Sequence, residues 1–283
     1  MSASEARSTG GLMPADSSNS ADATSVKATF TLPVGNASLH AAVQLPAGHT
    51  TPTQLLPIIQ DLESTIIDQV SREASAAGRP ISCRAGCGAC CRQMVPISLF
   101  EAEALTEWLH TLPEERQAAL RLRFQAALKA LRDAGVLETF LSGSWNLDEE
   151  SCTQFAVDYF HVGAACPFLE NESCSIHPIR PLSCREYLVT SSPELCRDPS
   201  VHELKGVILP LRPSRAMFLL GRHVDQDRRG WIPLVFLLAF AERGIKPGDY
   251  LAATGPAIFR QFLDYLLVSK DSDPTGAENQ TTS

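Results

Sequence analysis

The sequence predicts a mainly α-helical protein with a small N-terminal β-hairpin and a cysteine-rich core that contains irregular loops. Three observations predict this fold. Apolar residues alternate with period two over residues 27–48, they recur at helical spacing through much of 49–269, and all the cysteines fall within 80–200. The tails, 1–26 and 270–283, are rich in small and polar residues without periodicity, and we expect both to be disordered.

The expected hairpin consists of two alternating runs on either side of a Gly-Asn turn. The first run alternates from Phe30 to Val34, and the second from Leu39 to Leu45. Pro33 favours an edge strand, because proline cannot donate a ladder hydrogen bond. We expect the hairpin to cover the core; the alternative is an edge that a partner uses.

Helical spacing and end signals predict the helices. Ser98 and Glu101 form a capping-box pattern at the start of one helix, and Gly135 follows the last turn of another. Stripes of apolar residues three and four apart indicate a buried face on each helix. The expected helices cover residues 53–77, 98–109, 113–134, 148–163, 231–243 and 256–269.

Charge and hydropathy exclude several classes of protein. The chain of 283 residues has 24 Lys and Arg against 32 Asp and Glu, a net charge of −8, which argues against nucleic-acid binding. Its best apolar run, Trp231–Ala241, is far shorter than the roughly 20 residues of a membrane span, so we expect no membrane partner. The N-terminus lacks a secretory signal, which predicts the cytoplasm, where cysteines more often bind metals or catalyse than form disulfides.

Four cysteines lie within nine residues, and four more follow at wider spacing. The residues within the first group include glycine and alanine, which let the backbone curl tightly around an ion. Thiolates that bind zinc, or the irons of a cluster, require such a turn. The first group is Cys83, Cys87, Cys90 and Cys91, and the later group is Cys166, Cys174, Cys184 and Cys196.

Arginine directly follows four of these cysteines. Several thiolates in one region carry a large negative charge, and nearby guanidinium groups would lower the thiol pKa values and donate hydrogen bonds to sulfur. The alternative is that the arginines are solvated surface residues. They are Arg84, Arg92, Arg185 and Arg197.

The cysteine count leaves several arrangements open. Cys152 stands alone, and an inert buried thiol explains it best. A disulfide framework would need export, which the N-terminus does not support. Eight sulfurs could form two four-thiolate sites, each with zinc or one iron–sulfur cluster, or one polynuclear centre with bridging thiolates. Since vicinal cysteines do not easily bind one ion, we expect Cys91 to serve a different ion from Cys90, or to bridge.

The full pattern resembles a known family. Cx3Cx2CC in the first group, followed by CPFL at 166–169, Arg180-Pro181 and Cys184-Arg185, is similar to the YkgJ-type cysteine-cluster proteins over residues 80–200. Members are described as zinc- or iron-chelating domains or as iron–sulfur oxidoreductases. The resemblance implies that the eight cysteines of both groups are the metal ligands, and it adds Arg180 to the candidate arginines.

Three further residues match or replace family positions. His177 stands where many members carry tyrosine, and we expect it to pack beside the site rather than to bind metal. Glu186 and Tyr187 follow Cys184-Arg185 as in the family's ending. They could hydrogen-bond near the ligands, although Glu186 could equally start a helix.

Three functions follow as hypotheses. In the first, the protein holds an iron–sulfur cluster or other iron and acts in redox or modifying chemistry, with an iron–sulfur oxidoreductase as the candidate enzyme. In the second, a non-enzymatic protein chelates zinc and serves a protein partner. The third, metal-dependent protein methylation, rests on a flagellin lysine methylase with this type of cysteine cluster. Cx3Cx2C is also the radical-SAM spacing, but that barrel needs repeated strand–helix units, which this sequence lacks. The metal, the substrate, the redox or protein partner and the oligomeric state stay open.

Overall fold

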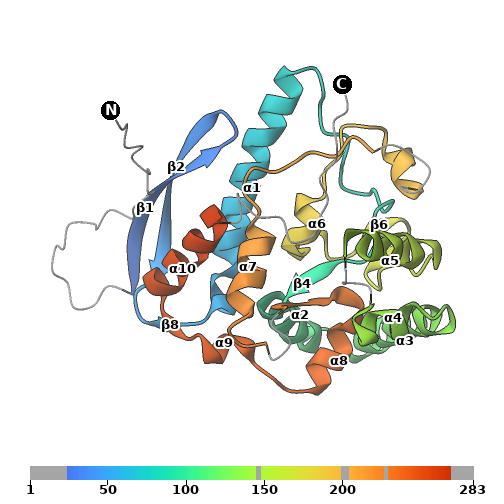
Figure 1. Cartoon of the computed structure of the whole chain (residues 1–283). Coiled ribbons are helices and arrows are strands. Elements are labelled where there is room, and N and C mark those ends of the chain that lie inside the picture. The colour runs from blue at the N-terminus through green and yellow to red at the C-terminus, as the bar shows by residue number, and fades with distance from the viewer. Residues whose placement is uncertain (1–23, 145–147, 199–203, 226–228, 269–283) are drawn as a thin grey trace.

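The computed structural model describes residues 24–144, 148–198, 204–225 and 229–268, and it is mainly helical with an N-terminal hairpin, as expected (Figure 1). The expected disorder of 1–26 falls almost wholly outside the described residues, and that of 270–283 does so entirely. Ser25 and Val26 already belong to the first strand, so the hairpin begins before residue 27.

The hairpin covers the core. Strands β1 (Ser25–Val34) and β2 (Ala37–Pro46) pair antiparallel through the two-residue turn at 35–36. Every second side chain of β1 from Ala28 to Val34 is buried, because one face of the hairpin packs on helices α1 and α10. The alternation in the sequence therefore marks a half-buried sheet surface.

Three helices and the hairpin share the first core. Helix α1 (Pro52–Ala76) begins at a capping box in which Thr51 and Gln54 satisfy each other's backbone N–H groups. Its buried stripe packs against α7 (Pro213–Gly221) and α10 (Gly255–Val268). This core forms one half of the molecule, on the left of Figure 1.

Two further cores form the other half. One contains α2 (Leu99–Thr111), α3 (Glu114–Asp133) and α8 (Leu237–Glu242). The other contains the end of α3 with α4 (Val136–Ser142), α5 (Glu149–His161) and the 3₁₀ turn η4 (Leu234–Phe236).

Short strands close the ends of these layers. β3 (His49–Thr50) pairs with β8 (Ala253–Thr254), which follows α9 (Pro247–Tyr250). β4 (Pro96–Ser98) pairs with β7 (Trp231–Pro233). The expectation of one helix over 231–243 was therefore wrong at its start. An apolar run has no distinct period, and here pairing with a distant strand decides its conformation.

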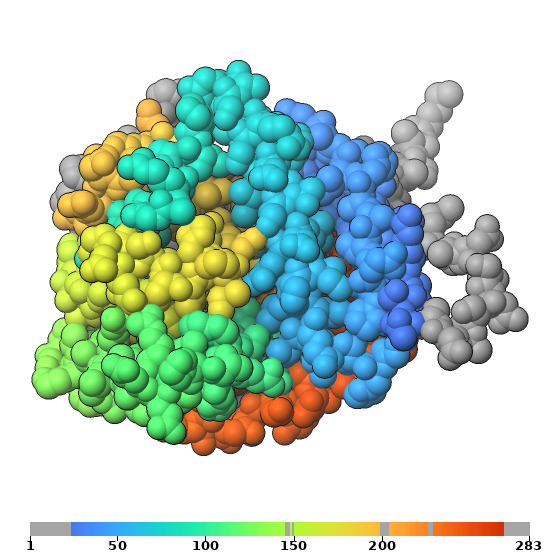
Figure 2. All heavy atoms as spheres, turned by 180° about the vertical axis from the view of Figure 1, so that it is seen from behind, coloured from blue at the N-terminus to red at the C-terminus, as the bar shows by residue number. Residues whose placement is uncertain are grey.

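The cysteine-rich region consists of coil and short elements on one side of the molecule. In chain order these are the coil after α1, then β5 (Leu169–Glu170), β6 (Ser173–Cys174), η2 (His177–Ile179), α6 (Leu182–Glu186) and η3 (Pro193–Arg197). Figure 2 shows the coil after α1 lying against the later segments at the surface. In the parts of the chain that the structure describes, no helix is both long and apolar enough to cross a bilayer.

Candidate metal centre

Tight turns wrap the first cysteine group. The backbone N–H of Cys87 donates to the carbonyl oxygen of Arg84 at 3.2 Å, and that of Cys91 donates to Gly88 at 3.0 Å. Gly86 has a φ of 84°, a left-handed conformation that a residue with a Cβ rarely adopts. The local sequence therefore forms the curl that a thiolate site needs.

Backbone contacts bring the later group to the first. The N–H of Cys166 donates to the carbonyl oxygen of Cys91 at 2.7 Å. Gly88 lies against the turn between β5 and β6, where an added Cβ would stand 2.8 Å from the carbonyl oxygen of Glu172. The Glu172 carboxylate pairs with Arg92 at 2.7 Å. These contacts join two groups that α2 to α5 separate along the chain.

The chain after α6 closes the other side of the site. Cys83 is exposed, and its sulfur accepts a hydrogen bond from the N–H of Val189 at 3.4 Å and lies 3.9 Å from the carbonyl oxygen of Tyr187. Cys87 packs with Cys196 and Val189 in a small apolar cluster. The first cysteine group is thus held against the segment that carries the last cysteine.

The thiols lie close enough to influence one another's ionisation. Burial, followed by nearby thiolates, raises the pKa of Cys166 to about 12 and that of Cys196 to about 11. The charge on Cys90 contributes in both cases, and it also contributes to the raised pKa values of Cys83, Cys174 and Cys184, for which burial is again the main cause. Cys90 therefore lies centrally among them.

Cys90 and Cys91 behave as a pair. A hydrogen bond from the Cys91 thiol lowers the pKa of Cys90 to about 7, with a smaller contribution from the positive charge of Arg180. The same bond and burial raise the pKa of Cys91. Cys90 is the thiol of the pair that ionises first, and the thiolate is the form that binds metals.

Charge and packing divide the thiols into two sets. The charges of Cys83 and Cys87 raise the pKa of Cys196, and Cys87 and Cys196 share one apolar cluster. The charges of Cys166 and Cys174 raise the pKa of Cys184. Cys166 and Cys174 also pack against the core of α2, α3 and α8. The charges of Cys166 and Cys184 also raise the pKa of Cys91. The charge of Cys90 affects thiols on both sides, so we place it by the expectation that vicinal cysteines serve different ions. On that basis we define a first set, Cys83, Cys87, Cys90 and Cys196, and a second set, Cys91, Cys166, Cys174 and Cys184.

The donor chemistry fits a metal that prefers sulfur. Thiolate ligands select zinc, copper(I) or iron–sulfur clusters over calcium or magnesium. Within the described ranges, no three Cys, His, Asp or Glu side chains already converge on a point where an ion could be held. We therefore expect the cysteine side chains to change χ1 rotamer when a metal binds.

The comparison with known families agrees with this chemistry. Residues 82–203 match the family model CxxCxxCC, described as "Putative zinc- or iron-chelating domain". This segment is therefore similar to the CxxCxxCC family. The match confirms the resemblance seen in the sequence and supports metal binding in general, without distinguishing iron from zinc. No curated protein and no solved structure matched the chain.

Two candidate arginines of the matched segment lie beside the thiols. The guanidinium charge of Arg180 contributes to the lowered pKa of Cys90 and opposes the rise in the pKa values of Cys83 and Cys174. Its buried Nε has no hydrogen-bond partner in the described structure. Arg92 pairs with Glu172, and the charge of the adjacent Cys91 contributes to the raised pKa of Arg92.

The other three arginines have different surroundings. Arg185 forms an ion pair with Glu63 of α1, with Nε 2.5 Å from Oε2, and it donates to the carbonyl oxygen of Gln60. These contacts connect α6 to α1. Arg84 and Arg197 are exposed, as the solvated-surface alternative expects.

His177 and Tyr187 lie at the edge of the thiol group. The Nε2 atom of His177 is 3.1 Å from Nη1 of Arg180, and burial together with that charge lowers its pKa. The hydroxyl of Tyr187 accepts from Gln93 at 3.0 Å. Burial raises the Tyr187 pKa, and nearby thiolates that include Cys196 raise it further. Both residues therefore flank the sulfurs.

Three buried carboxylates hold α6, the helix of Cys184. Glu186 is the last residue of α6, and its carboxylate accepts the N–H of Ser214 at 2.7 Å. It thereby satisfies a backbone donor in the first turn of α7, which is close to the helix-start role that was the alternative for this residue. Glu63 pairs with Arg185, and Glu101 accepts the N–H of Leu182 at 2.7 Å. Sequence reasoning missed Glu63 and Glu101 as neighbours of the site. The capping box of Glu101 was visible, but its bond to α6 depends on the tertiary fold.

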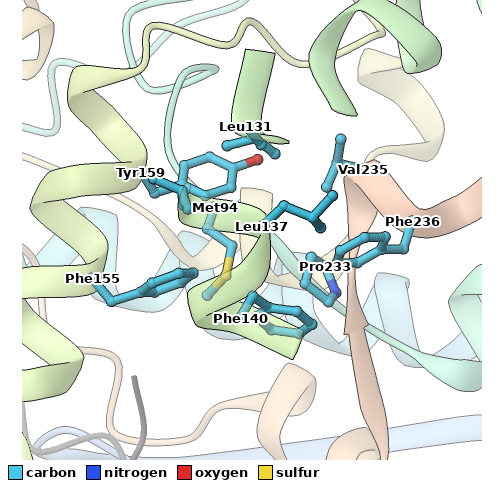
Figure 3. Close-up of a pocket in the computed structure, with 10 residues that line it drawn as sticks. Met94, Leu131, Leu137, Phe140, Phe155, Tyr159, Pro233, Val235 and Phe236 are labelled. Carbon is cyan, nitrogen blue, oxygen red and sulfur yellow. The ribbon is translucent and has the colours of Figure 1, made fainter. Parts of the chain in front are cut away.

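Cys152 lies apart from the eight thiols. It is half-buried and packs against the core of α4 and α5, whereas the sequence predicted a buried thiol. The same core contains a cavity of about 10 Å³ that apolar and aromatic side chains line, among them Met94, Phe140 and Tyr159 (Figure 3). This space has the size of about one water molecule, which is too small for an organic substrate.

Proposed function

We propose that this protein binds iron through its eight cysteines, as iron–sulfur clusters or as thiolate-bound iron, and uses the centre in redox or modifying chemistry. The observation that carries the proposal is the gathering of eight thiols from five separate segments around Cys90. The donors are all sulfur, which suits iron–sulfur ligation. The CxxCxxCC match supports metal binding by this segment.

The two sets of thiols suggest how the ligands divide. Each set contains four cysteines, and four thiolates are the usual complement of one iron–sulfur cluster or one tetrahedral zinc. This division assigns Cys90 and Cys91 to different ions, as the strain of vicinal ligands favours. Arg180 would then offset thiolate charge beside both sets. Its positive charge favours the thiolate form of Cys83 and Cys90 in the first set and of Cys174 in the second.

Zinc chelation is the second candidate. Its support is the way the thiols are spread over short and irregular segments, since they lie in the coil after α1, in the coil after α5, in β6, in α6 and in η3. A closed four-thiolate zinc site stabilises such irregular segments without any turnover. The described part of the chain offers no observation that favours protein methylation over these two candidates.

Metal content after purification without oxygen distinguishes the two candidates. We expect a brown protein with sulfur-to-iron absorption in the visible range, and with iron and acid-labile sulfide in elemental analysis. A colourless protein with stoichiometric zinc would replace the iron proposal with zinc chelation. Protein that takes up neither metal under reducing conditions would refute metal binding altogether.

A further inference from the structure

Glu101 connects two chain segments that supply thiols of the second set, the one that follows Cys91 and the one that carries Cys184. Its Oε2 accepts the N–H and the hydroxyl of Ser98, each at 2.8 Å, in the capping box of α2. Its Oε1 accepts the N–H of Leu182 at 2.7 Å, at the start of α6. Ser98 ends β4, which begins five residues after Cys91, and Leu182 stands two residues before Cys184.

The contact is buried, and both oxygens of the Glu101 carboxylate take part in it. Glu101 is 3% exposed and Ser98 is fully buried. Both carboxylate oxygens act as acceptors, and a single side chain closes the capping box of its own helix while it satisfies an N–H at the first turn of another. A capping box alone would need only one of these oxygens.

We infer that Glu101 is a positioning residue for the metal centre, which sets the spacing between Cys91 and Cys184. This inference rests on the proposed metal binding. Groups that orient ligands from outside the coordination sphere commonly change metal affinity about 10- to 100-fold when they are removed. We therefore expect the loss of this contact to affect the metal site beyond its effect on folding.

The substitution Glu101→Gln tests the contact with little change of shape. A glutamine has one acceptor oxygen, and its NH₂ group can only donate. In either orientation of the amide, the N–H groups of Ser98 or of Leu182 would face another donor. Glu101→Asp is the second variant. It keeps the charge at the first turn of α2, where an acid is favourable, but it is too short to serve both segments.

Glu103 provides a matched control on the same helix. It is 6% exposed, and its Oε2 accepts the hydroxyl of Thr53 at 2.8 Å and the N–H of Gly248 at 2.9 Å. These partners lie on α1 and α9 rather than on α6. Glu103→Ala should therefore destabilise the fold without moving Cys184.

The readouts are the thiolate-to-cobalt absorption of the full chain loaded with Co²⁺ and the rate of Zn²⁺ release to a chelator. We expect Glu101→Gln and Glu101→Asp to shift the cobalt spectrum and to release zinc about 10- to 100-fold faster. Glu103→Ala should keep the wild-type spectrum and rate. Wild-type behaviour of both Glu101 variants, or equal effects of Glu103→Ala, would overturn the inference.

A double-mutant cycle tests the path of the effect. If Glu101 acts through α6, Glu101→Gln should add little to the zinc release rate of Cys184→Ser, whereas independent effects would multiply. Multiplied effects would contradict the inference. A wild-type protein that binds neither Co²⁺ nor Zn²⁺ through its cysteines would instead refute the proposed function, and the inference with it.

Discussion

The backbone N–H of Cys166 donates to the carbonyl oxygen of Cys91 at 2.7 Å, although four helices lie between the two residues in the chain. The bond places the start of the later cysteine group directly on the end of the first group. It is formed by the backbone, so it does not depend on the state of either thiol. The two halves of the cysteine motif are therefore joined through the backbone as well as through the cysteine side chains.

Gly88→Ala should weaken this junction. The added Cβ would stand 2.5 Å from Cδ1 of Leu169 and 2.8 Å from the carbonyl oxygen of Glu172, and backbone atoms cannot easily retreat. Overpacking of this kind costs about 1–3 kcal/mol. Urea unfolding of the metal-free protein should show that loss. Gly48→Ala is the control, because its Cβ would meet nothing within 4 Å; equal stability of the two variants would contradict the prediction.

Local rules predicted those parts of the fold that depend on nearby residues. The alternation around Phe30 and the Ser98–Glu101 capping box each mark one element, and both elements form as expected. The helix expected to start at Trp231 does not start there, because this residue lies in β7 and pairs with β4 across the molecule. Short elements such as α6 also carry too few residues for a period to be read.

The candidate site divides in the same way. Spacing and family resemblance named the cysteines and Arg180, because those residues form a dense local pattern. Glu63 and Glu101 could not be found from the sequence, because their relation to Cys184 runs through contacts with α6 from other helices. Arg185 has a partner that the sequence did not indicate, because Glu63 comes from α1 across the fold.

Serine variants test whether the thiols form two sets. Cys196→Ser removes a thiol of the first set and Cys174→Ser one of the second, so each should lose about half of the bound metal if each set holds one site. Cys152→Ser should retain all of it, because this thiol packs in a separate core. Elemental analysis of the purified variants measures these ratios. Complete loss of metal from both single variants would indicate one shared polynuclear centre instead.

Arg180→Gln should make Cys90 harder to ionise. The guanidinium charge makes a smaller contribution than the Cys91 hydrogen bond to the low pKa of Cys90, about 7, so its removal should raise that pKa. The pH dependence of iodoacetamide alkylation at Cys90 in metal-free protein reports the change, with its midpoint moving to higher pH. Arg84→Gln removes an exposed arginine near the same loop and should leave the midpoint in place. An unchanged midpoint in Arg180→Gln would show that the Cys91 hydrogen bond acts alone.

Glu63 should make the stability of the metal-free protein depend on pH. Burial, followed by repulsion from Glu186, raises its pKa from 4.5 to about 9, although Arg185 opposes the shift and Glu101 adds to it. The folded state therefore binds a proton that the unfolded state releases above about pH 4.5. The resulting stabilisation is fully present below that pH and is lost as the pH rises through about 9.

Glu63→Gln removes this proton while it keeps the shape of the neutral acid. The free energy of unfolding, measured by urea titration of the metal-free protein between pH 5 and pH 9, should fall less steeply with pH in this variant than in the wild type. Some slope should remain, because burial also raises the pKa values of Glu101 and Glu186. Asp68→Asn removes one carboxylate from the exposed face of α1 and controls for the change of net charge. A wild-type slope in Glu63→Gln would mean that the ion pair with Arg185 keeps Glu63 ionised throughout this range.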